Sequence, residues 1–539
     1  MQISRHNPRF FYHCGAVRVF AFIVCLLCVS CSDDNATADA SNDTAQSVDG
    51  TGTQGALAPP LLFDVMPDRA AWFVDNESIQ VSGKVSPASA PISLVKVNGK
   101  PTPFDGGDFS VAPTVVPGVN VVNLRVEAED GERSVDGRAF FHGDVNAAGG
   151  VIDNAVSIHL GKLFLDDDEE DLDDIAGIAQ WVLTDPTFLN GIDAAIETDL
   201  AMLTPTAVTI QSAAIDLTTD TELLHLSCSL GAFHVGFEVL GLGGLGDLIA
   251  GPATMDADNA TLSIALSVTT EKGALKIEPT FSKLEFTNFV LATESYPNLK
   301  EEYPSLHDLM RGYIESKMSE TIGSMMAELL TTFLGGFAYQ TSFGEENPVS
   351  MSFSMSSVTV APHGINLNLS AQVSSPLGLK GELPIKFGSL RTENESLSGE
   401  FSDEPIAFAI DDDLMNQLTF AIWHSGTLSD QVFEAEDLEE FDLKAFPEVF
   451  QPLTRVSYSL NLPVTLGRRI LADDDMLYDI AMGELELVLE SGTKKRFSLS
   501  FNTRTGVGVT IGDDVILALA PDIRPKFMDL AVACTEAPE

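Results

Sequence analysis

Strict alternation of apolar and polar residues is the strongest pattern in the chain. Successive side chains of a strand point to opposite faces, so such alternation predicts long strands with one buried face. Ile365, Leu367 and Leu369 show it in the second half of the chain. In the first half, residues 262–269 show it. The large apolar residues Leu262, Ile264, Leu266 and Val268 alternate with Ser263, Ala265, Ser267 and Thr269.

A helical period replaces the alternation between residues 303 and 334. We expect Ser305 to cap this helix and Gly335 to end it. A helix of about 28 residues is about 42 Å long, so it must lie along an elongated sheet. Its apolar residues recur with the spacing of one helix face: Leu306, Leu309, Met310, Tyr313, Ile314, Met318, Ile322, Met325, Leu329 and Phe333.

A short helix is predicted over residues 411–426, directly after the apolar stretch PIAFAI. Asp411 can accept hydrogen bonds from the first free amides, and Gly426 can adopt the left-handed conformation that ends a helix. One face of this helix is apolar, which is typical of a helix packed on a core: Leu414, Leu418, Ala421 and Ile422.

Residues 59–146 contain short alternating strands separated by turn residues. Asn98-Gly99 is a strong hairpin signal because both turn positions need a positive φ. The order of these strands and turns resembles a bacterial immunoglobulin-like domain of the glucodextranase domain-B type, a class of module that usually serves as a spacer. The resemblance is carried by Gly83, Asn98, Gly99, Phe109, Gly118, Asn120 and Asp130.

The first 30 residues have the organisation of an export signal. Arg5, Arg9 and Arg18 precede the apolar run VFAFIVCLLCV, which is too short to span a bilayer. Ser30 and Cys31 follow, and the arrangement resembles a bacterial lipoprotein signal, although Cys28 stands where leucine is usual. The resemblance implies that Cys31 is lipidated and anchors the chain to a membrane. Cleavage by an ordinary signal peptidase is the alternative.

Residues 31–58 have the composition of a flexible tether, rich in Ser, Thr, Asp, Ala and Gly. We expect the protein in the cell envelope. The outer membrane is favoured because Ser32, rather than an aspartate, follows the lipidated cysteine.

The chain is strongly acidic, with 79 Asp and Glu against 30 Lys and Arg and a formal net charge of −49. Such a surface repels nucleic acids and anionic membranes, so no nucleic-acid partner is expected. Four of the six cysteines lie at or before Cys31, which excludes a disulfide scaffold. Whether the remaining Cys228 and Cys534 pair is left open.

Motifs for catalysis or cofactor binding are absent from the sequence. It contains no G-x-S-x-G, H-E-x-x-H, P-loop or dinucleotide fingerprint. The acidic run at 166–174 lacks the central glycine of a calcium loop, and we expect its acids in the first turn of a helix. His225 and His234 flank Cys228 at spacings of three and six residues, which do not fit one face of a strand. We therefore predict no catalytic residue, no metal and no cofactor.

The region around the short helix carries a second resemblance. An apolar strand ends at Ile410, Asn416 follows six residues later, Gly426 ten beyond that, and Leu428 two later. This spacing resembles the first helix of the C-terminal barrel in the family of bactericidal/permeability-increasing and lipopolysaccharide-binding proteins. The acidic helix, long strands and very long helix upstream are similar to the N-terminal barrel of that family.

The resemblance implies a tubular lipid-binding fold over residues 150–539. We expect an N-terminal barrel at 150–345 and a C-terminal barrel at 346–539, the second reduced or truncated because no long helix closes it. An apolar pocket between sheet and helix would take lipid acyl chains. The residues expected to line the pockets are Leu309, Ile314, Met318, Ile322, Met325, Leu414, Leu418 and Ile422.

The predicted fold class is thus α+β and β-rich: an immunoglobulin-like sandwich, then two elongated barrels of twisted antiparallel sheet wrapped on long helices. The predicted function is non-enzymatic binding or transfer of a lipid or other hydrophobic ligand by a cell-envelope lipoprotein. The lack of a basic cluster argues against lipopolysaccharide neutralisation. The alternatives are a surface adhesion or structural protein with filled β-domains and an unknown protein partner, and a hydrolase with a dispersed active site.

The anchor can be tested by replacing Cys31. Cys31→Ala is expected to give unprocessed or soluble protein, because no thiol remains to accept the lipid. Mass spectrometry of the N-terminal peptide and membrane fractionation would measure both effects. Unchanged membrane association, with no lipid on the parent peptide, would contradict the prediction.

Overall fold

The computed structural model describes most of the chain from residue 60 to residue 536. Cys31 and the predicted tether lie outside the described residues. These are 60–74, 78–87, 90–169, 171–185, 195–197, 201–343, 348–375, 387–392, 405–426, 431–434, 454–468, 478–491, 494–507 and 526–536.

Residues 60–142 form two sheets that share one core, with strand orders β1-β3-β7-β6 and β2-β9-β8-β4-β5. Asn98 and Gly99 have φ values of 49° and 73°, which confirms the predicted hairpin turn. Gly83 leaves room for the ring of Phe109, since a Cβ there would lie 2.8 Å from it. Membership of the immunoglobulin-like class stays a prediction. The strands are β1 (Leu61–Met66), β2 (Ala71–Phe73), β3 (Val81–Ser86), β4 (Ile92–Val97), β5 (Lys100–Pro101), β6 (Phe104–Asp105), β7 (Asp108–Val111), β8 (Gly118–Ala128) and β9 (Arg133–His142).

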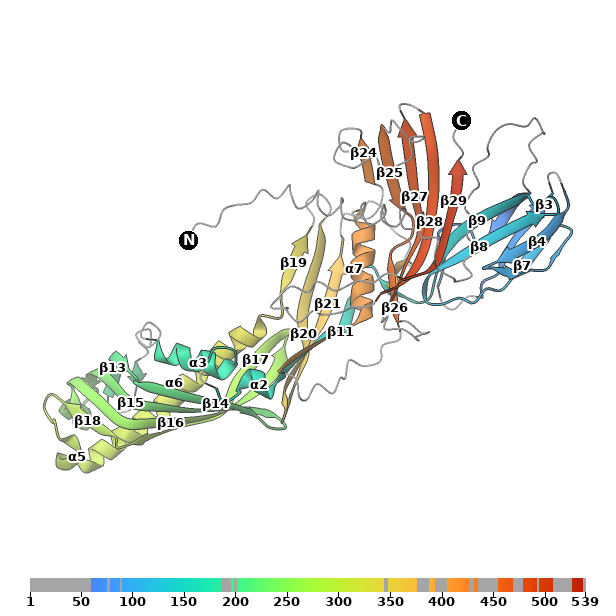
Figure 1. Cartoon of the computed structure of the whole chain (residues 1–539). Coiled ribbons are helices and arrows are strands. Elements are labelled where there is room, and N and C mark those ends of the chain that lie inside the picture. Colours follow the sequence, from blue (N-terminus) through green and yellow to red (C-terminus); the bar gives the residue numbers. More distant parts are fainter. Residues whose placement is uncertain are drawn as a thin grey trace.

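A seven-stranded antiparallel sheet forms a curled half-barrel at the other end of the molecule (Figure 1). The predicted alternation is confirmed on β16, where Leu262, Ile264, Leu266 and Val268 are all buried. The β-rich α+β class is therefore confirmed, whereas two complete barrels stay a prediction. The strands are β12 (Ile196–Glu197), β13 (Ala201–Thr209), β14 (Ser212–Thr219), β15 (Leu223–Gly241), β16 (Gly251–Glu271), β17 (Ala274–Thr287) and β18 (Val290–Thr293), with the 3-10 helix η1 (Gly244–Ile249) before β16.

Helices border this half-barrel. The predicted long helix is α6 (Pro304–Gly335), preceded by the short α5 (Leu299–Glu302). Its N-cap is Tyr303, so the prediction of Ser305 is wrong; Pro304 occupies the first turn, where its missing N–H costs nothing. None of the described helices is long and apolar enough to cross a lipid bilayer.

The acidic run does not lie within a helix, contrary to expectation. Its described residues, 166–169 and 171–174, lie between α2 (Lys162–Leu165) and α3 (Ile175–Thr184). The first turn of α3 contains no acid, and Asp174 instead caps the helix by accepting a hydrogen bond from the N–H of Gly177. Asp and Asn side chains compete with the backbone in this way, which favours caps over helix interiors.

A five-stranded sheet forms the middle of the chain, in the order β19-β20-β21-β11-β23. Its strand β11 comes from the range assigned to the N-terminal barrel, but it pairs with β21 and β23 from beyond residue 346. The two predicted barrels therefore share this sheet. Its strands are β11 (Val151–Gly161), β19 (Gln340–Phe343), β20 (Val349–Ala361), β21 (Gly364–Ser374) and β23 (Ile406–Ile410), and β10 (Val145–Ala147) pairs with β22 (Gly388–Leu390) nearby.

The predicted short helix is α7 (Asp412–His424), and its caps are confirmed. The Asp411 carboxylate accepts from the N–H of Asp413 at 2.8 Å, and Gly426 has a φ of 85°. Leu414 and Ala421 pack on the middle sheet.

Buried amides of α7 join the two halves of the chain. Asn416 donates to the carbonyl of Leu466 at 2.9 Å and accepts from its N–H at 2.8 Å. Gln417 accepts from the N–H of Val373 and donates to the carbonyl of Gly150, both at 2.7 Å. Each amide thus completes the hydrogen bonding of a strand or loop on one side of the helix.

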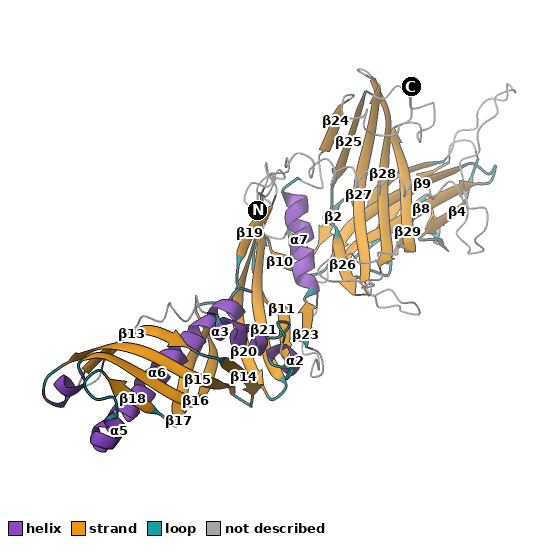
Figure 2. Cartoon of the chain, turned by 60° about the vertical axis from the view of Figure 1, so that its left-hand side comes forward, coloured by secondary structure: helices purple, strands orange, loops and turns teal. Residues whose placement is uncertain are grey.

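The C-terminal strands form a six-stranded sheet whose neighbour is the two-sheet unit of residues 60–142 (Figure 2). Strands β27, β28 and β29 contact β8 and β9. A long helix beneath this sheet is absent from the described residues, so the expected wrapping is not seen there. The strands are β24 (Gln431–Glu434), β25 (Arg455–Leu460), β26 (Thr465–Arg468), β27 (Tyr478–Ser491), β28 (Lys494–Val507) and β29 (Lys526–Glu536).

Glu484 on β27 is the polar centre of this contact. Its buried carboxylate accepts from the Arg69 guanidinium at 3.0 Å, from the N–H of Ala139 at 2.6 Å and from the Ser500 hydroxyl at 3.2 Å. This buried network joins the two-sheet unit to the C-terminal sheet, and a spacer role for the unit stays a prediction. The two-sheet unit is part of the C-terminal body.

The Asp411 carboxyl provides a test of the α7 cap. Burial and the carboxylates of Asp413 and Asp412 raise its pKa to about 6, despite the hydrogen bond from the N–H of Asp413. The folded state therefore binds more protons than the unfolded state between about pH 4 and pH 6, and stability falls as pH rises through that range.

Asp411→Asn removes this penalty and keeps a good N-cap. We expect it to raise the free energy of unfolding by about 1–3 kcal/mol at pH 8 and to have little effect at pH 4. Urea unfolding at both pH values measures this, with Asp105→Asn at an exposed site as the control. A less stable variant at pH 8 would show that the carboxylate supports the cap.

Candidate ligand pocket

The pocket lies where the strands of the half-barrel bend. On β15, Ala232 has a φ of 47° and no partner on β16, whereas its neighbours Gly231 and Phe233 are paired. Asp258, which lies opposite Ala232 on β16, is unpaired as well, so the register is the same on both sides and the two strands are kinked together. The buried positions of β15 accordingly change from even to odd numbers, from Cys228 and Leu230 to Phe233 and onward.

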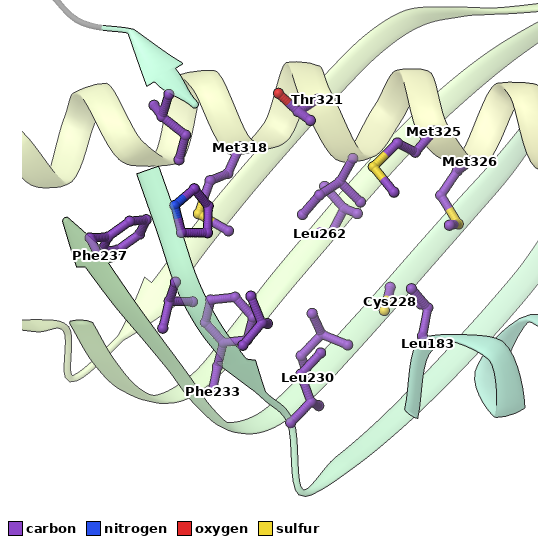
Figure 3. Close-up of a pocket in the computed structure, with 16 residues that line it drawn as sticks. Leu183, Cys228, Leu230, Phe233, Phe237, Leu262, Met318, Thr321, Met325 and Met326 are labelled. Carbon is purple, nitrogen blue, oxygen red and sulfur yellow. The ribbon is translucent and has the colours of Figure 1, made fainter. Parts of the chain in front are cut away.

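The neighbouring strand β16 changes at the same level, and β13 shifts further along, opposite Gly236 and Phe237. On β16 the buried positions change between Ala257 and Ala260, and β13 shows a register shift between Pro205 and Ala207. Three adjacent strands therefore curve together, and their concave side faces α6. Figure 3 shows the strands with Cys228, Leu230 and Phe233 opposite Met318 and Met325 of the helix.

Two contacts hold α6 beside β17. Small residues allow the helix to approach closely: the hydroxyls of Ser282 and Ser319 are 2.7 Å apart, and a Cβ at Gly323 would lie 3.1 Å from the Ser282 hydroxyl. Further along, Arg311 donates to the carbonyl of Phe286 at 2.7 Å, and Glu315 accepts from the Phe286 N–H at 3.1 Å. The helix thus covers the edge of the sheet.

The lining is almost entirely apolar. It combines side chains of α3, β12, β13, β15, β16 and α6 without a charged group, and Thr321 contributes the one hydroxyl. The residues are Leu183, Ile196, Pro205, Val208, Ile210, Cys228, Leu230, Phe233, Val235, Phe237, Leu262, Met318, Thr321, Ile322, Met325 and Met326.

The enclosed part of the pocket is small. Its volume is about 50 Å³, and the unfilled space is about 740 Å³ when the open mouth is included. An enclosed volume of about 10–15 Å³ is enough for a water molecule, but a cavity with apolar walls stays dry. The volume of about 740 Å³ that includes the mouth lies within the range of ligand pockets, about 300–1,000 Å³. A long acyl chain would therefore require the lining side chains to move.

Cys228 is a free, buried thiol in the wall of the pocket. Burial raises its pKa to about 12, so the thiolate is scarcely populated near neutral pH. Because the thiolate is the reactive form, Cys228 serves as an apolar wall residue rather than a nucleophile.

The predicted pocket residues of the long helix occupy three environments. Met318, Ile322 and Met325 lie in the pocket wall. Ile314 is fully buried in the closed core, and Leu309 is outside the pocket with 43% of its surface exposed. The prediction for Leu309 needs correction because the helix buries Met310, not its neighbour, against the sheet.

The predicted pocket residues of α7 lie elsewhere. Leu414 is buried against the middle sheet, and Leu418 and Ile422 pack partly buried on the same cluster. A second hollow, of about 210 Å³, lies on the C-terminal sheet and is more polar, with Arg455 and Glu486 in its wall. None of the three α7 residues lines it. Contact of any predicted residue with a ligand stays a prediction.

Two clusters of three aspartates have carboxylates close enough together to hold a cation. One comprises Asp167, Asp171 and Asp173 in the loop before α3, and the other comprises residues 411–413. A hydrogen bond with Asp171 raises the pKa of Asp173 to about 6, as expected for two carboxyls that share a proton. Both groups lie outside the pocket.

Comparisons with known proteins give weak similarities. No family model and no curated protein matches the chain. The crystal structure of a lipopolysaccharide binding protein is 13% identical with a TM-score of 0.34, over 72% of this chain and 85% of that one. SGBP-B of the Bacteroides ovatus mixed-linkage glucan utilization locus, in complex with a mixed-linkage heptasaccharide, is 11% identical with a TM-score of 0.13, over 44% and 61%. Such low scores carry no argument about function.

The reactivity of Cys228 tests whether the pocket is closed to water. With the pKa raised from 9.0 to about 12, we expect a polar maleimide at pH 8 to label it roughly 1,000-fold more slowly in the folded protein than in urea. Mass spectrometry of the peptide containing Cys228 measures the rate. Equal rates in the two states would mean that the wall is open to solvent.

Proposed function

We propose that the chain binds an uncharged hydrophobic group, such as the acyl chain of a lipid, between α6 and the bent strands β13 and β15. The observation that carries the proposal is the lining, in which none of the sixteen residues has a charged side chain. Each CH₂ group moved from water into such a site gains about 0.8 kcal/mol. Affinity therefore grows with chain length and needs no ion pair.

Three methionines make the small enclosed volume compatible with this function. Met318, Met325 and Met326 line the pocket from one side (Figure 3). Methionine is unbranched and has three rotatable bonds, so it can fill a gap and withdraw from it at low cost. In the proposed mechanism these side chains occupy the pocket when it is empty and turn aside for the ligand.

The proposed role is binding or transfer without covalent chemistry. The pocket holds no acid, base or histidine, and its thiol has a pKa of about 12. The lining therefore offers no general base or activated nucleophile. We further propose that the protein is a cell-envelope lipoprotein anchored through Cys31, in the outer membrane because Ser32 rather than an aspartate follows that cysteine.

A second candidate is an adhesion or structural protein with filled domains. The observation that favours it is the enclosed volume of about 50 Å³, because the remaining interior of the half-barrel is occupied by side chains. Such a protein would bind a protein partner and no lipid. Lipid extraction and native mass spectrometry of the purified chain distinguish the two candidates.

Met318→Trp tests the proposed pocket directly. The larger ring would fill the space that the ligand needs, so we expect uptake of a fluorescent fatty acid to be lost. Because the side chain borders open space, the loss of stability should be below the 1–3 kcal/mol typical of overpacking. Lipid titration and the thermal midpoint measure the two effects.

Two tryptophan variants of the same helix serve as controls. Leu309→Trp adds the ring at an exposed position and should change neither property. Met310→Trp adds it in the closed core, where Met310 is fully buried, and should lower the thermal midpoint. If Met318→Trp lowers the midpoint as much as Met310→Trp, and the parent takes up no lipid, the pocket is part of a filled core.

A further inference from the structure

The edge strand β23 exposes three large apolar side chains on one face. Ile406, Phe408 and Ile410 are 38%, 60% and 52% exposed. Among the described strands, β23 pairs with β11 alone and ends the middle sheet. Exposed apolar edge strands are unusual in soluble proteins because they can pair with another strand.

These three side chains lie on the same face of the middle sheet as buried residues of β11, but they are themselves exposed. Ile406 lies opposite Leu160 and Phe408 opposite Ile158, and directly opposed residues of an antiparallel pair share a face. Both partners on β11 are buried in the core of the half-barrel. The apolar layer thus extends one strand further than the elements that cover it.

The backbone of the same three residues points away from the sheet. The carbonyl of Pro405 accepts from the N–H of Gly161, and the N–H of Asp411 donates to the carbonyl of Ala155. Inward and outward groups alternate along an antiparallel strand. The N–H and C=O groups of Ile406, Phe408 and Ile410 are therefore directed to the open edge.

The sequence of the strand is a palindrome, Ile-Ala-Phe-Ala-Ile. If two copies pair antiparallel about Phe408, Ile406 faces the second copy's Ile410 and Phe408 faces itself. Every outward N–H then meets an outward C=O, and every large side chain meets an identical one. A two-fold contact requires this kind of self-complementary surface.

We propose that β23 is the contact between two copies of this chain, joined edge to edge as a symmetric dimer with Phe408 on the two-fold axis. The strand carries no charge, although 20% of the residues in the chain are charged. Within its five residues no charges are opposed in the dimer, and Asp411 at its end lies opposite the second copy's Pro405. On the opposite face of the strand, Ala407 and Ala409 place only small side chains.

Disulfide trapping tests the contact without altering its charge. Hydrogen-bonded residue pairs on antiparallel strands have Cα atoms about 5.5 Å apart, within the range that a disulfide spans. Phe408→Cys on the full chain should form a covalent dimer under mild oxidation. Ala409→Cys should not, because it would face the second copy's Ala407. Phe343→Cys, at the opposite edge of the same sheet, controls for random collision.

Charge pairs test the register. In the proposed dimer, Ile406→Lys with Ile410→Lys places lysine against lysine, whereas Ile406→Lys with Ile410→Glu places lysine against glutamate. We expect the first pair to raise the dissociation constant at least about tenfold and the second to restore it. Sedimentation velocity of the full chain measures both, and the thermal midpoint checks that each variant is folded.

The two experiments can overturn the proposal in distinct ways. A parent chain that remains monomeric at every concentration tested contradicts it. Equal trapping of Phe408→Cys and Phe343→Cys shows collision rather than a defined contact. Equal dissociation constants for the two charge pairs exclude this register, and trapping of Phe408→Cys on a different protein excludes self-pairing.

Discussion

The close approach of α6 to β17 is the contact on which the half-barrel depends. A curled sheet that does not close into a barrel leaves a strand edge and a concave apolar face uncovered. Here the edge residue Phe286 forms hydrogen bonds with Arg311 and Glu315, and Ser282 contacts Ser319. With the helix fixed on this side, its adjacent face turns toward the strands. The position of the pocket follows from that orientation.

Helix α7 is also fixed to its neighbouring strands by side-chain hydrogen bonds, but these come from amides instead of charged groups. Asn416 and Gln417 are almost completely buried, and each bonds to backbone groups of a neighbouring segment. A buried polar group without a partner costs about 1–3 kcal/mol, so these residues fix which strands meet α7. Apolar side chains of α7 add to this placement, since Leu414, Phe420 and Trp423 are buried as well.

The sequence predicts those elements whose cause is local. Alternation identified β16 and β21, the 3.6-residue period identified α6, and Asp411 and Gly426 identified the ends of α7. It did not predict the kink at Ala232, although the buried positions of β15 change there from even to odd numbers. That signal is present in the sequence, but an average over the strand conceals it.

The sequence did not predict contacts between distant segments, for a different reason. The buried face of α6 depends on where β17 approaches the helix, so the periodic stripe assigned Leu309 to the pocket although it is exposed. The pairing of β11 with β21 joins residues more than 200 positions apart. The acid pattern likewise gave no sign that Glu484 would bond to Arg69 and Ala139. Each of these depends on segments that local patterns cannot bring together.

The edges of the other sheets show why β23 differs. Edge strands of soluble proteins are commonly protected by proline, by charge or by a covering element. β5 consists of Lys100 and Pro101, β13 carries Pro205 near the edge of the half-barrel, and α6 covers β17. β23 itself contains no proline or charged residue, although Pro405 precedes it and Asp411 follows it, and none of the described elements covers its open edge; it is apolar and palindromic. In a chain whose charge of −49 opposes nonspecific association, such an edge is more consistent with a specific contact than with a protected surface.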